Sequence, residues 1–269
     1  TSSQELFFEL KKYRTKYIEC IELTRDTSIF NENPIVLDKE KEKFTFLSPH
    51  RNGLEKGTEK IWDALELCKS DFDVIIIDWF DNRNPEEKEI EEKLRSNKPK
   101  QVKFIPIIKR EEMPAYYAYA DAIIGQMRLG YHGAVEMEAA FCKRPVVHFS
   151  DPKIKYKTDT ESIISPFLPH SNEPKKIAEI IDKIVTNKVF REKLQNDENE
   201  FMKKISDPTI IAEQWKKLIE KNKTGIVHES KSFFSLFVKI FVFVSEKMYY
   251  NNKMQEKNIQ VFGKKRYNN

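Results

Sequence analysis

The chain has 269 residues, of which 39% are hydrophobic and 33% charged, and its formal net charge at pH 7 is +4. This composition excludes a wholly disordered chain and suits one large soluble domain or two small ones. The charge is uneven, because residues 221–269 hold ten Lys/Arg and three Asp/Glu and so carry +7, which leaves −3 for the rest. A basic tail favours an anionic surface as partner, and we predict no nucleic-acid partner.

The three cysteines, Cys20, Cys68 and Cys142, are scattered along the chain and form no CxxC pair. We expect reduced, packed thiols, which favours a cytoplasmic location. The sequence begins at Thr1 without an initiator Met or a signal peptide, and we expect the natural start to lie elsewhere.

From residue 44 onward, strand-like and helix-like runs alternate with short connections. The run "VIIIDW" (74–79) is typical of a strand covered on both faces, and Ile61, Leu65 and Cys68 recur at helical spacing. The expected strands cover 44–48, 74–79, 102–108, 121–127 and 145–150, and the expected helices between them cover 56–70, 85–96, 113–120 and 133–143.

After residue 172 only helices are expected, over 173–187, 189–206 and 208–222. The alternation predicts an α/β fold, a Rossmann-like parallel sheet with helices on both faces, followed by these C-terminal helices. Ligands of such sheets bind beyond the carboxyl ends of the strands, where loops meet helix N-termini.

Five of the seven glycines lie in or beside two loops at that edge of the predicted sheet. Gly53 and Gly57 follow the first expected strand, whereas Gly130 and Gly133 follow the fourth, which contains Gly125. Glycines let a backbone approach a ligand closely. These two loops are therefore the first candidates for a binding site.

The first loop, "SPHRNGLEKG" (48–57), places Arg51 and Lys56 around a glycine and just before a helix. A guanidinium fork, an ammonium group and the free N–H groups of the helix start would together suit a diphosphate. A solvated basic loop is an equally good interpretation of the spacing alone.

The second loop leads into "GAVEMEAAFCK" (133–143), which carries Glu136 and Glu138. A carboxylate one turn into a helix can accept two ribose hydroxyls, and we assign this role to Glu138. A glutamate that only complements the helix dipole is the alternative, and it fits Glu136 better. We expect Glu136 to be solvated and the two side chains to point in different directions.

Four segments, taken together, resemble the C-terminal domain of GT-B-fold glycosyltransferases. "HRNGLEKGTEKIWDAL" is similar to the arginine, Lys-Gly and helix of that family, and "EAAFCKRPVV" to its "EAMA-x-G-x-PV" signature. "VKFIPIIKREEMPAYYAYADAII" and "ISPFLPHSNEPKKIAEII" resemble the segments between and after these two. The resemblance covers about residues 44–222 in the family's order.

The resemblance extends to the start of the chain and implies a domain division. "LKKYRTKYIECIELTRDTSIF" resembles the end of the family's N-terminal domain and its linker, with Asp26 and Phe30. The implied parts are a remnant of the N-terminal domain and linker (1–40), a nucleotide-sugar donor domain (41–222) and a basic, aromatic-rich extension (223–269).

What the resemblance implies about function is transfer of a sugar from a nucleotide-diphosphate donor to an unknown glycan or lipid acceptor. Arg51 and Lys56 would hold the diphosphate and stabilise its charge as it leaves, which requires no metal and no cofactor. The implied donor-binding residues are Gly53, Gly57, Pro106, Ile107, Ile108, Gln126, Gly130, Tyr131, His132, Gly133, Glu138 and Ala139.

The chain departs from the family pattern at two positions. Gly130 stands where many retaining members carry a further Glu, and Lys143 stands where the signature has Gly. A subgroup with "Q-x3-G-x-x-G" is closer, and Gln126 would then face the donor. The stereochemistry stays open, as do two alternative functions, a non-catalytic nucleotide-sugar-binding module and a GT-B-like sugar-nucleotide epimerase.

Other polar and aromatic residues give weaker signals. The histidines at 50, 132, 148 and 170 show no metal-ligand spacing, and a loop histidine is the more frequent explanation for His132 than a ligand contact. We expect Tyr116, Tyr117 and Tyr119 to pack in the core. Asp78 either serves a site or caps a turn.

The segment "SFFSLFVKIFVFVSEKMYY" (232–250) contains five phenylalanines and has Lys239 near its middle. An interfacial helix with basic flanks would make the protein peripheral on the cytoplasmic membrane face. Packing on another domain is an equally good interpretation.

Overall fold

The structure is a computed structural model of the whole chain, and it describes residues 21–33, 37, 40–80, 82–158 and 160–223. The chain divides into two compact units, Thr1–Trp215 and Lys216–Asn269. Of the second unit, only the last turns of one helix are among the described residues. The division predicted from the sequence at residues 40 and 222 stays a prediction.

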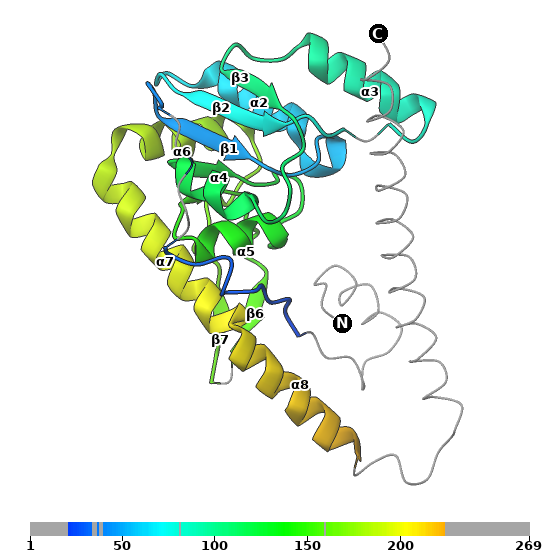
Figure 1. Cartoon of the computed structure of the whole chain (residues 1–269), viewed down its shortest axis with the longest axis vertical. Coiled ribbons are helices and arrows are strands. Elements are labelled where there is room, and N and C mark those ends of the chain that lie inside the picture. The colour runs from blue at the N-terminus through cyan, green and yellow to red at the C-terminus, as the bar shows by residue number, and fades with distance from the viewer. Residues whose placement is uncertain (1–20, 34–36, 38–39, 81, 159, 224–269) are drawn as a thin grey trace. The chain divides into compact units, whose positions relative to one another are not determined.

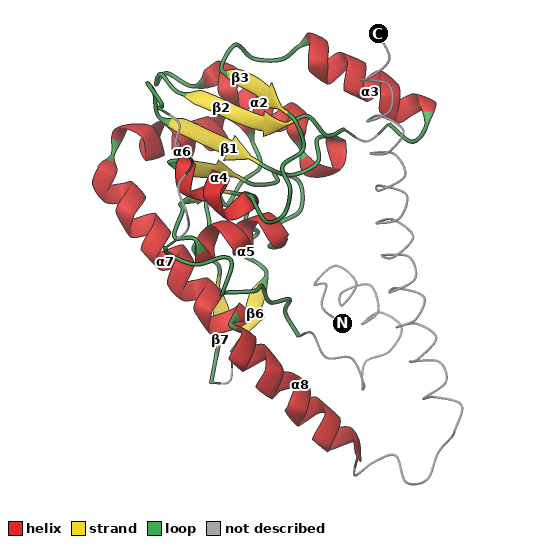
Figure 2. Ribbon diagram, in the orientation of Figure 1, coloured by secondary structure: helices red, strands yellow, loops and turns green. Residues whose placement is uncertain are grey.

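A parallel sheet forms the centre of the first unit (Figures 1 and 2). Its strand order is β3-β2-β1-β4-β5, so the order reverses between β1 and β4. The strands are β1 (Thr45–Ser48), β2 (Asp73–Ile77), β3 (Val102–Ile105), β4 (Ala122–Ile124) and β5 (Val146–Val147). This sheet confirms the predicted α/β fold.

Helices cover both faces of the sheet, and each face has its own hydrophobic core. Side chains along a strand alternate between the two faces, so Phe46 lies in one core and Leu47 in the other. The helices are η1 (Leu54–Lys56), α2 (Thr58–Leu67), α3 (Pro85–Ser96), α4 (Met113–Tyr119), α5 (Ala134–Phe141), α6 (Pro174–Thr186), α7 (Lys188–Ser206) and α8 (Pro208–Lys223).

The core on one face receives side chains from α2, α3 and α6, and the other from α4 and α5, while α7 contributes Leu194 to the first and Phe201 to the second. In α6, Ile177, Ile181 and Ile184 recur at helical spacing and are all buried. Local signals set the helix starts: the Asn84 side chain accepts the N–H of Glu87, and Pro85 takes the first helical position of α3.

The structure differs from the predicted elements at several boundaries. The helix expected over 56–70 is divided by Gly57, whose φ of 73° ends η1 before α2 begins. The strand expected over 102–108 ends at Ile105, before Pro106, which lacks an N–H for the sheet. Lys143 ends α5 with a φ of 54°, a left-handed backbone that glycine adopts more easily.

An antiparallel hairpin of β6 (Lys155–Lys157) and β7 (Ser162–Ile164) lies outside the elements predicted from the sequence. Each strand is three residues long, too short for its alternation to be recognised. No helix within the described residues combines the length and the hydropathy needed to cross a membrane. The segment 232–250 lies outside the described residues.

Candidate functional site

The two glycine-containing loops meet at the carboxyl edge of the sheet, beside the reversal of strand order. The backbone N–H of Met127 donates to the carbonyl oxygen of Lys56 at 2.8 Å. A Cβ on Gly57 would lie 3.1 Å from Met127 and 3.3 Å from the Arg128 nitrogen. The loops after β1 and β4 are therefore in direct contact, at the kind of crevice where open parallel sheets bind ligands.

Arg51 and Lys56 lie on the first of these loops. The Arg51 guanidinium forms an ion pair with Glu55, with 3.2 Å between Nη2 and Oε2, and its side chain is half-buried. Lys56 is the last residue of η1, directly before the start of α2 at Gly57. The start of α2 has no side-chain cap. The N–H groups of Thr58 and Lys60 donate to the carbonyls of Gly53 and Gly57, so the dipole of the helix, more than free N–H groups, favours an anion here.

Arg128 is a third cation at this edge of the sheet, and no sequence motif marks it. Its Nη1 lies 3.2 Å from Oε1 of Glu59, in the first turn of α2, and its side chain is 51% exposed. The backbone of Arg128 lies against Gly57, next to Lys56, which the sequence predicts to bind the diphosphate. A single arginine in a loop does not indicate a phosphate-binding residue in the sequence, because only the folded chain brings Arg128 to α2.

Glu136 is buried, and the prediction that it is solvated was wrong. Its carboxylate accepts the N–H of Gly133 at 2.7 Å and of Gln126 at 3.2 Å, and it lies 3.2 Å from Nδ1 of His148. Burial alone would raise its pKa, but His148 and the backbone N–H groups lower the pKa below its usual range. Glu136 thus forms hydrogen bonds with both ends of the loop after β4, at Gln126 and at Gly133.

Glu138 points the other way, which confirms that the two glutamates have different directions. One oxygen lies 3.1 Å from Nη1 of Arg110 and 3.3 Å from Nε of Arg25, and the other accepts the Tyr117 hydroxyl at 3.1 Å. Burial raises the pKa of Glu138, although Arg110 and Arg25 oppose this effect. The ribose role stays a prediction, and neither arginine was anticipated.

The side-chain amide of Gln126 is used within its own loop. Its oxygen accepts the N–H groups of Arg128 and Leu129, and its nitrogen donates to the carbonyls of Leu129 and Tyr131. These bonds fix the shape of the loop that carries Arg128. A contact of Gln126 or Tyr131 with a donor stays a prediction.

Gly130 packs against Asp151 rather than facing open space. A Cβ at Gly130 would lie 2.9 Å from the Asp151 nitrogen, and that N–H donates to the Gly130 carbonyl at 3.0 Å. No side chain fits there without movement of the Asp151 segment. The carboxylate that the resemblance leads one to expect at position 130 has no room in this backbone.

His132 is buried in an aromatic cluster, with ring centroids 4.4 Å from Phe167 and 5.0 Å from Tyr156. Burial lowers its pKa well below the usual value, so the ring stays neutral. The His132 ring thus packs against Phe167 and Tyr156, and a contact of His132 with a donor stays a prediction.

The remaining predicted residues divide between surface and core. Ile107 is 62% exposed in the loop after β3, whereas Ile108 and Ala139 are core residues and Pro106 is exposed. Gly53 lies at the start of η1. Other predicted residues have structural partners: Asp78 pairs with Arg95 at 2.5 Å and Tyr117 is fully buried, as expected for a packing tyrosine.

Comparison with solved structures finds similar folds at low sequence identity. Anabaena HepE in complex with UDP and glucose is 17% identical over 79% of this chain and 60% of that chain, with a TM-score of 0.58. Sucrose-phosphate synthase from Thermosynechococcus elongatus is 18% identical over 84% and 58%, with a TM-score of 0.63. A glycosyltransferase from Rickettsia africae is 16% identical over 80% and 61%, with a TM-score of 0.59.

At this identity these likenesses establish the fold alone, and the chain spans about 60% of the length of the first two. No curated protein sequence gives a significant match. The family "Glycosyl transferases group 1" matches residues 30–204, which is more than half of the chain and includes both loops of the candidate site. The chain belongs to the group 1 glycosyl transferases.

Proposed function

We propose that the chain carries the donor site of a glycosyltransferase, which moves a sugar from a nucleoside diphosphate to an acceptor. Family membership supports the reaction class, and the Anabaena protein of similar fold is a complex with UDP and glucose. The observation that carries the proposal is the contact between Lys56 and Met127, which joins the two predicted donor loops at the edge of the sheet.

Three cations surround the start of α2 in this proposal: Arg51, Lys56 and Arg128. Positive groups and helix N–H groups stabilise the charge that develops on a leaving diphosphate. In the described structure two of these cations are paired with carboxylates, Arg51 with Glu55 and Arg128 with Glu59. A diphosphate would compete with these carboxylates for the guanidinium groups.

The nucleoside would lie toward Glu138 and the loop after β3. Glu138 would accept ribose hydroxyls, and the ion pairs with Arg110 and Arg25 oppose the rise in its pKa that burial causes. Pro106 and the exposed Ile107 offer apolar surface beside this position. Gly53, Gly57 and Gly133 would line the backbone that approaches the phosphates or the sugar.

One observation favours a second function, a nucleotide-sugar-binding module without catalysis. The backbone of Gly130 leaves no room for a side chain because Asp151 lies against it. A side chain that contacts the transferred sugar from position 130 is thereby excluded, whereas a backbone contact is not. Binding of the donor would be retained in such a module, so binding and turnover have to be measured separately.

The proposal is tested by titrating the full chain with UDP, UMP and uridine in a calorimeter. Because the cations are expected to contact both phosphates, we expect UDP to bind more tightly than UMP, and uridine to bind most weakly. The preference for UDP should weaken as salt is added. Equal affinities for UDP and uridine would contradict a diphosphate site.

We further propose a cytoplasmic protein that contacts an anionic membrane surface through residues 232–250 and uses a glycan or lipid acceptor. The apolar, aromatic composition of that segment and its basic flanks support this. Co-sedimentation with anionic vesicles, with and without residues 231–269, tests it. Equal pelleting of both proteins would contradict membrane binding by the tail.

A further inference from the structure

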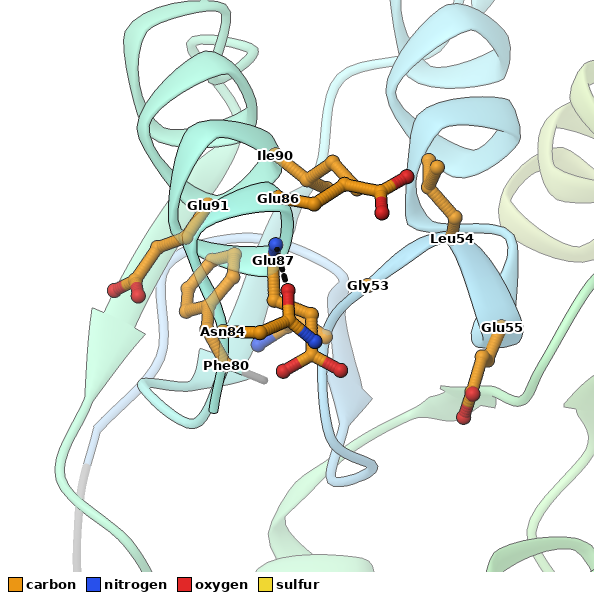
Figure 3. A pocket seen from close by; sticks show the side chains of 10 residues that line it. Gly53, Leu54, Glu55, Phe80, Asn84, Glu86, Glu87, Ile90 and Glu91 are labelled. Atoms are coloured by element: carbon orange, nitrogen blue, oxygen red, sulfur yellow. Dashed lines mark hydrogen bonds between the residues drawn. The ribbon is translucent and has the colours of Figure 1, made fainter. Parts of the chain in front are cut away.

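A cavity of about 210 Å³ lies between η1 and α3, at the carboxyl ends of β1 and β2 (Figure 3). It is separate from the loop after β4, which carries the other half of the proposed donor site. The cavity is lined by Asn52, Gly53, Leu54, Glu55, Phe80, Asn84, Glu86, Glu87, Ile90 and Glu91.

The side-chain oxygen of Asn52 is a buried hydrogen-bond acceptor that receives no hydrogen bond. Its Nδ2 donates to the carbonyls of Ile77 at 2.8 Å and Trp79 at 3.1 Å, at the end of β2. An amide flip would set Oδ1 against these two carbonyls, so the orientation is fixed. Oδ1 itself has no hydrogen-bond partner, although Asn52 is only 1% exposed. Such an acceptor is costly unless a ligand or water supplies a hydrogen.

The other polar side chains of the cavity are nearly all acceptors too. Four of them are carboxylates, and the carbonyl of Asn84 is already used to cap α3, as the dashed bond in Figure 3 shows. An acceptor-rich lining is complementary to a ligand with several N–H or O–H groups.

The negative charge of the cavity favours a ligand whose N–H groups belong to a cation. Three of its four carboxylates have an arginine partner outside it: Glu55 pairs with Arg51, Glu87 with Arg83 and Glu91 with Arg95. Arg95 is shared with Asp78, and among the described residues no cation is paired with Glu86, so the site carries at least one carboxylate in excess. A group with a single positive charge would balance the site.

The walls limit the size and shape of the ligand. Leu54, Phe80 and Ile90 supply apolar surface, and Leu54 remains 40% exposed at the opening. We propose that this pocket is a second binding site, which takes a small group bearing a protonated amine. The C–H part of the group contacts the apolar wall while its ammonium donates to Asn52 and the carboxylates.

This site goes beyond the proposed donor site, although both use η1. Gly53, Leu54 and Glu55 line the pocket, whereas Lys56 and Gly57 contact the loop after β4. The acidic pocket and the cluster of cations therefore lie on either side of η1 and share the ion pair of Glu55 with Arg51. If the chain acts as a glycosyltransferase, an amine-bearing second substrate fits the pocket, and that assignment alone rests on the proposed function.

The test is a titration of the isotope-labelled full chain by NMR with glucosamine, glucose and N-acetylglucosamine, at slightly acidic pH. These probes share a ring, and only the first carries an ammonium. We expect glucosamine to shift the backbone amides of Gly53, Leu54 and Glu87 and the side-chain amide of Asn52. The other two sugars should bind at least about threefold more weakly, as expected for loss of a partly exposed ion pair.

Glu86→Gln should weaken glucosamine binding by about two- to fivefold. Glu92→Gln is the matched control, because Glu92 is exposed on α3 and does not line the pocket. The proposal is overturned if all three sugars act alike, if nothing shifts at Asn52, or if both variants weaken binding equally. A stronger response to calcium chloride than to glucosamine would also overturn it. UDP added to the same sample should shift the backbone amides of Met127 and Arg128, which do not line the pocket, so failure of the donor site is distinguished from failure of the pocket.

Discussion

The backbone N–H of Met127 donates to the carbonyl oxygen of Lys56 at 2.8 Å. This bond joins the loop after β1 to the loop after β4, on the two neighbouring strands where the strand order reverses. It positions the Lys56 backbone and brings Arg128 to the start of α2. The proposed donor site therefore includes residues from both loops.

Gly57 makes the junction possible, and Gly57→Ala should damage it. Its φ of 73° is left-handed, and a Cβ would lie 3.1 Å from Met127. We expect a loss of about 1–3 kcal/mol in the free energy of unfolding, the usual cost of a non-glycine residue in strained backbone. Urea denaturation measures it, with Glu66→Ala on the exposed face of α2 as control. Unchanged stability would show that the two loops can separate freely.

Hydrophobic periodicity predicted the fold, because the central strands β1 and β4 are buried on both faces and a helix such as α6 buries one face. Val74, Ile76 and Ile77 illustrate this, since all three are buried as their run predicts. The break at Gly57 was missed, because a Lys-Gly pair within an apolar pattern leaves the helix boundary undetermined. The partners of Glu138 were missed for another reason: Arg25 and Arg110 reach it only through the tertiary fold.

Arg128 should contribute to binding of a diphosphate although no sequence motif marks it. Arg128→Ala should weaken UDP binding by about 1.5–3 kcal/mol, the range for hydrogen bonds to charged groups. Glu59→Gln should strengthen binding by up to about 1 kcal/mol, because it frees the Arg128 guanidinium from a partly exposed pair. Calorimetry measures both. Weaker binding by Glu59→Gln would indicate that the pair holds Arg128 in place instead.

Glu138 should distinguish ribose from deoxyribose if it is the ribose ligand. We expect the chain to prefer UDP over 2′-deoxy-UDP, because a carboxylate would accept the 2′-hydroxyl. Glu138→Gln should reduce that preference, with a loss of about 1.5–3 kcal/mol in UDP binding. Competition binding with the two nucleotides measures the ratio. An unchanged ratio in the variant would restrict Glu138 to its ion pairs with Arg25 and Arg110.

Glu198 should make stability depend on pH. It is fully buried on α7, its Oε2 accepts the Val146 N–H at 2.9 Å, and its Oε1 has no partner. Burial raises its pKa well above the usual value, so the folded chain favours the protonated form. Its stabilising contribution is therefore complete below the ordinary carboxyl pKa of the unfolded chain. That contribution is lost as pH rises through the folded-state pKa.

Glu198→Gln should mimic the protonated acid at every pH. We expect a higher unfolding temperature than wild type at neutral pH and a difference that shrinks in acid. Thermal unfolding over a pH series measures this, with the exposed neighbour Glu200→Gln as control. A variant that is least stable at neutral pH, relative to wild type, would show that the carboxylate is needed in its charged form.

Calorimetric titration with UDP of Arg51→Ala and Lys56→Ala tests the donor site most directly. The matched controls are Arg83→Ala and Lys88→Ala, which remove the same charges on or beside α3. We predict that each site variant weakens UDP binding by about 1.5–3 kcal/mol, while both controls bind as wild type. Wild-type affinity in both site variants, or an equal loss in the controls, would contradict the assignment of this edge of the sheet to the donor diphosphate.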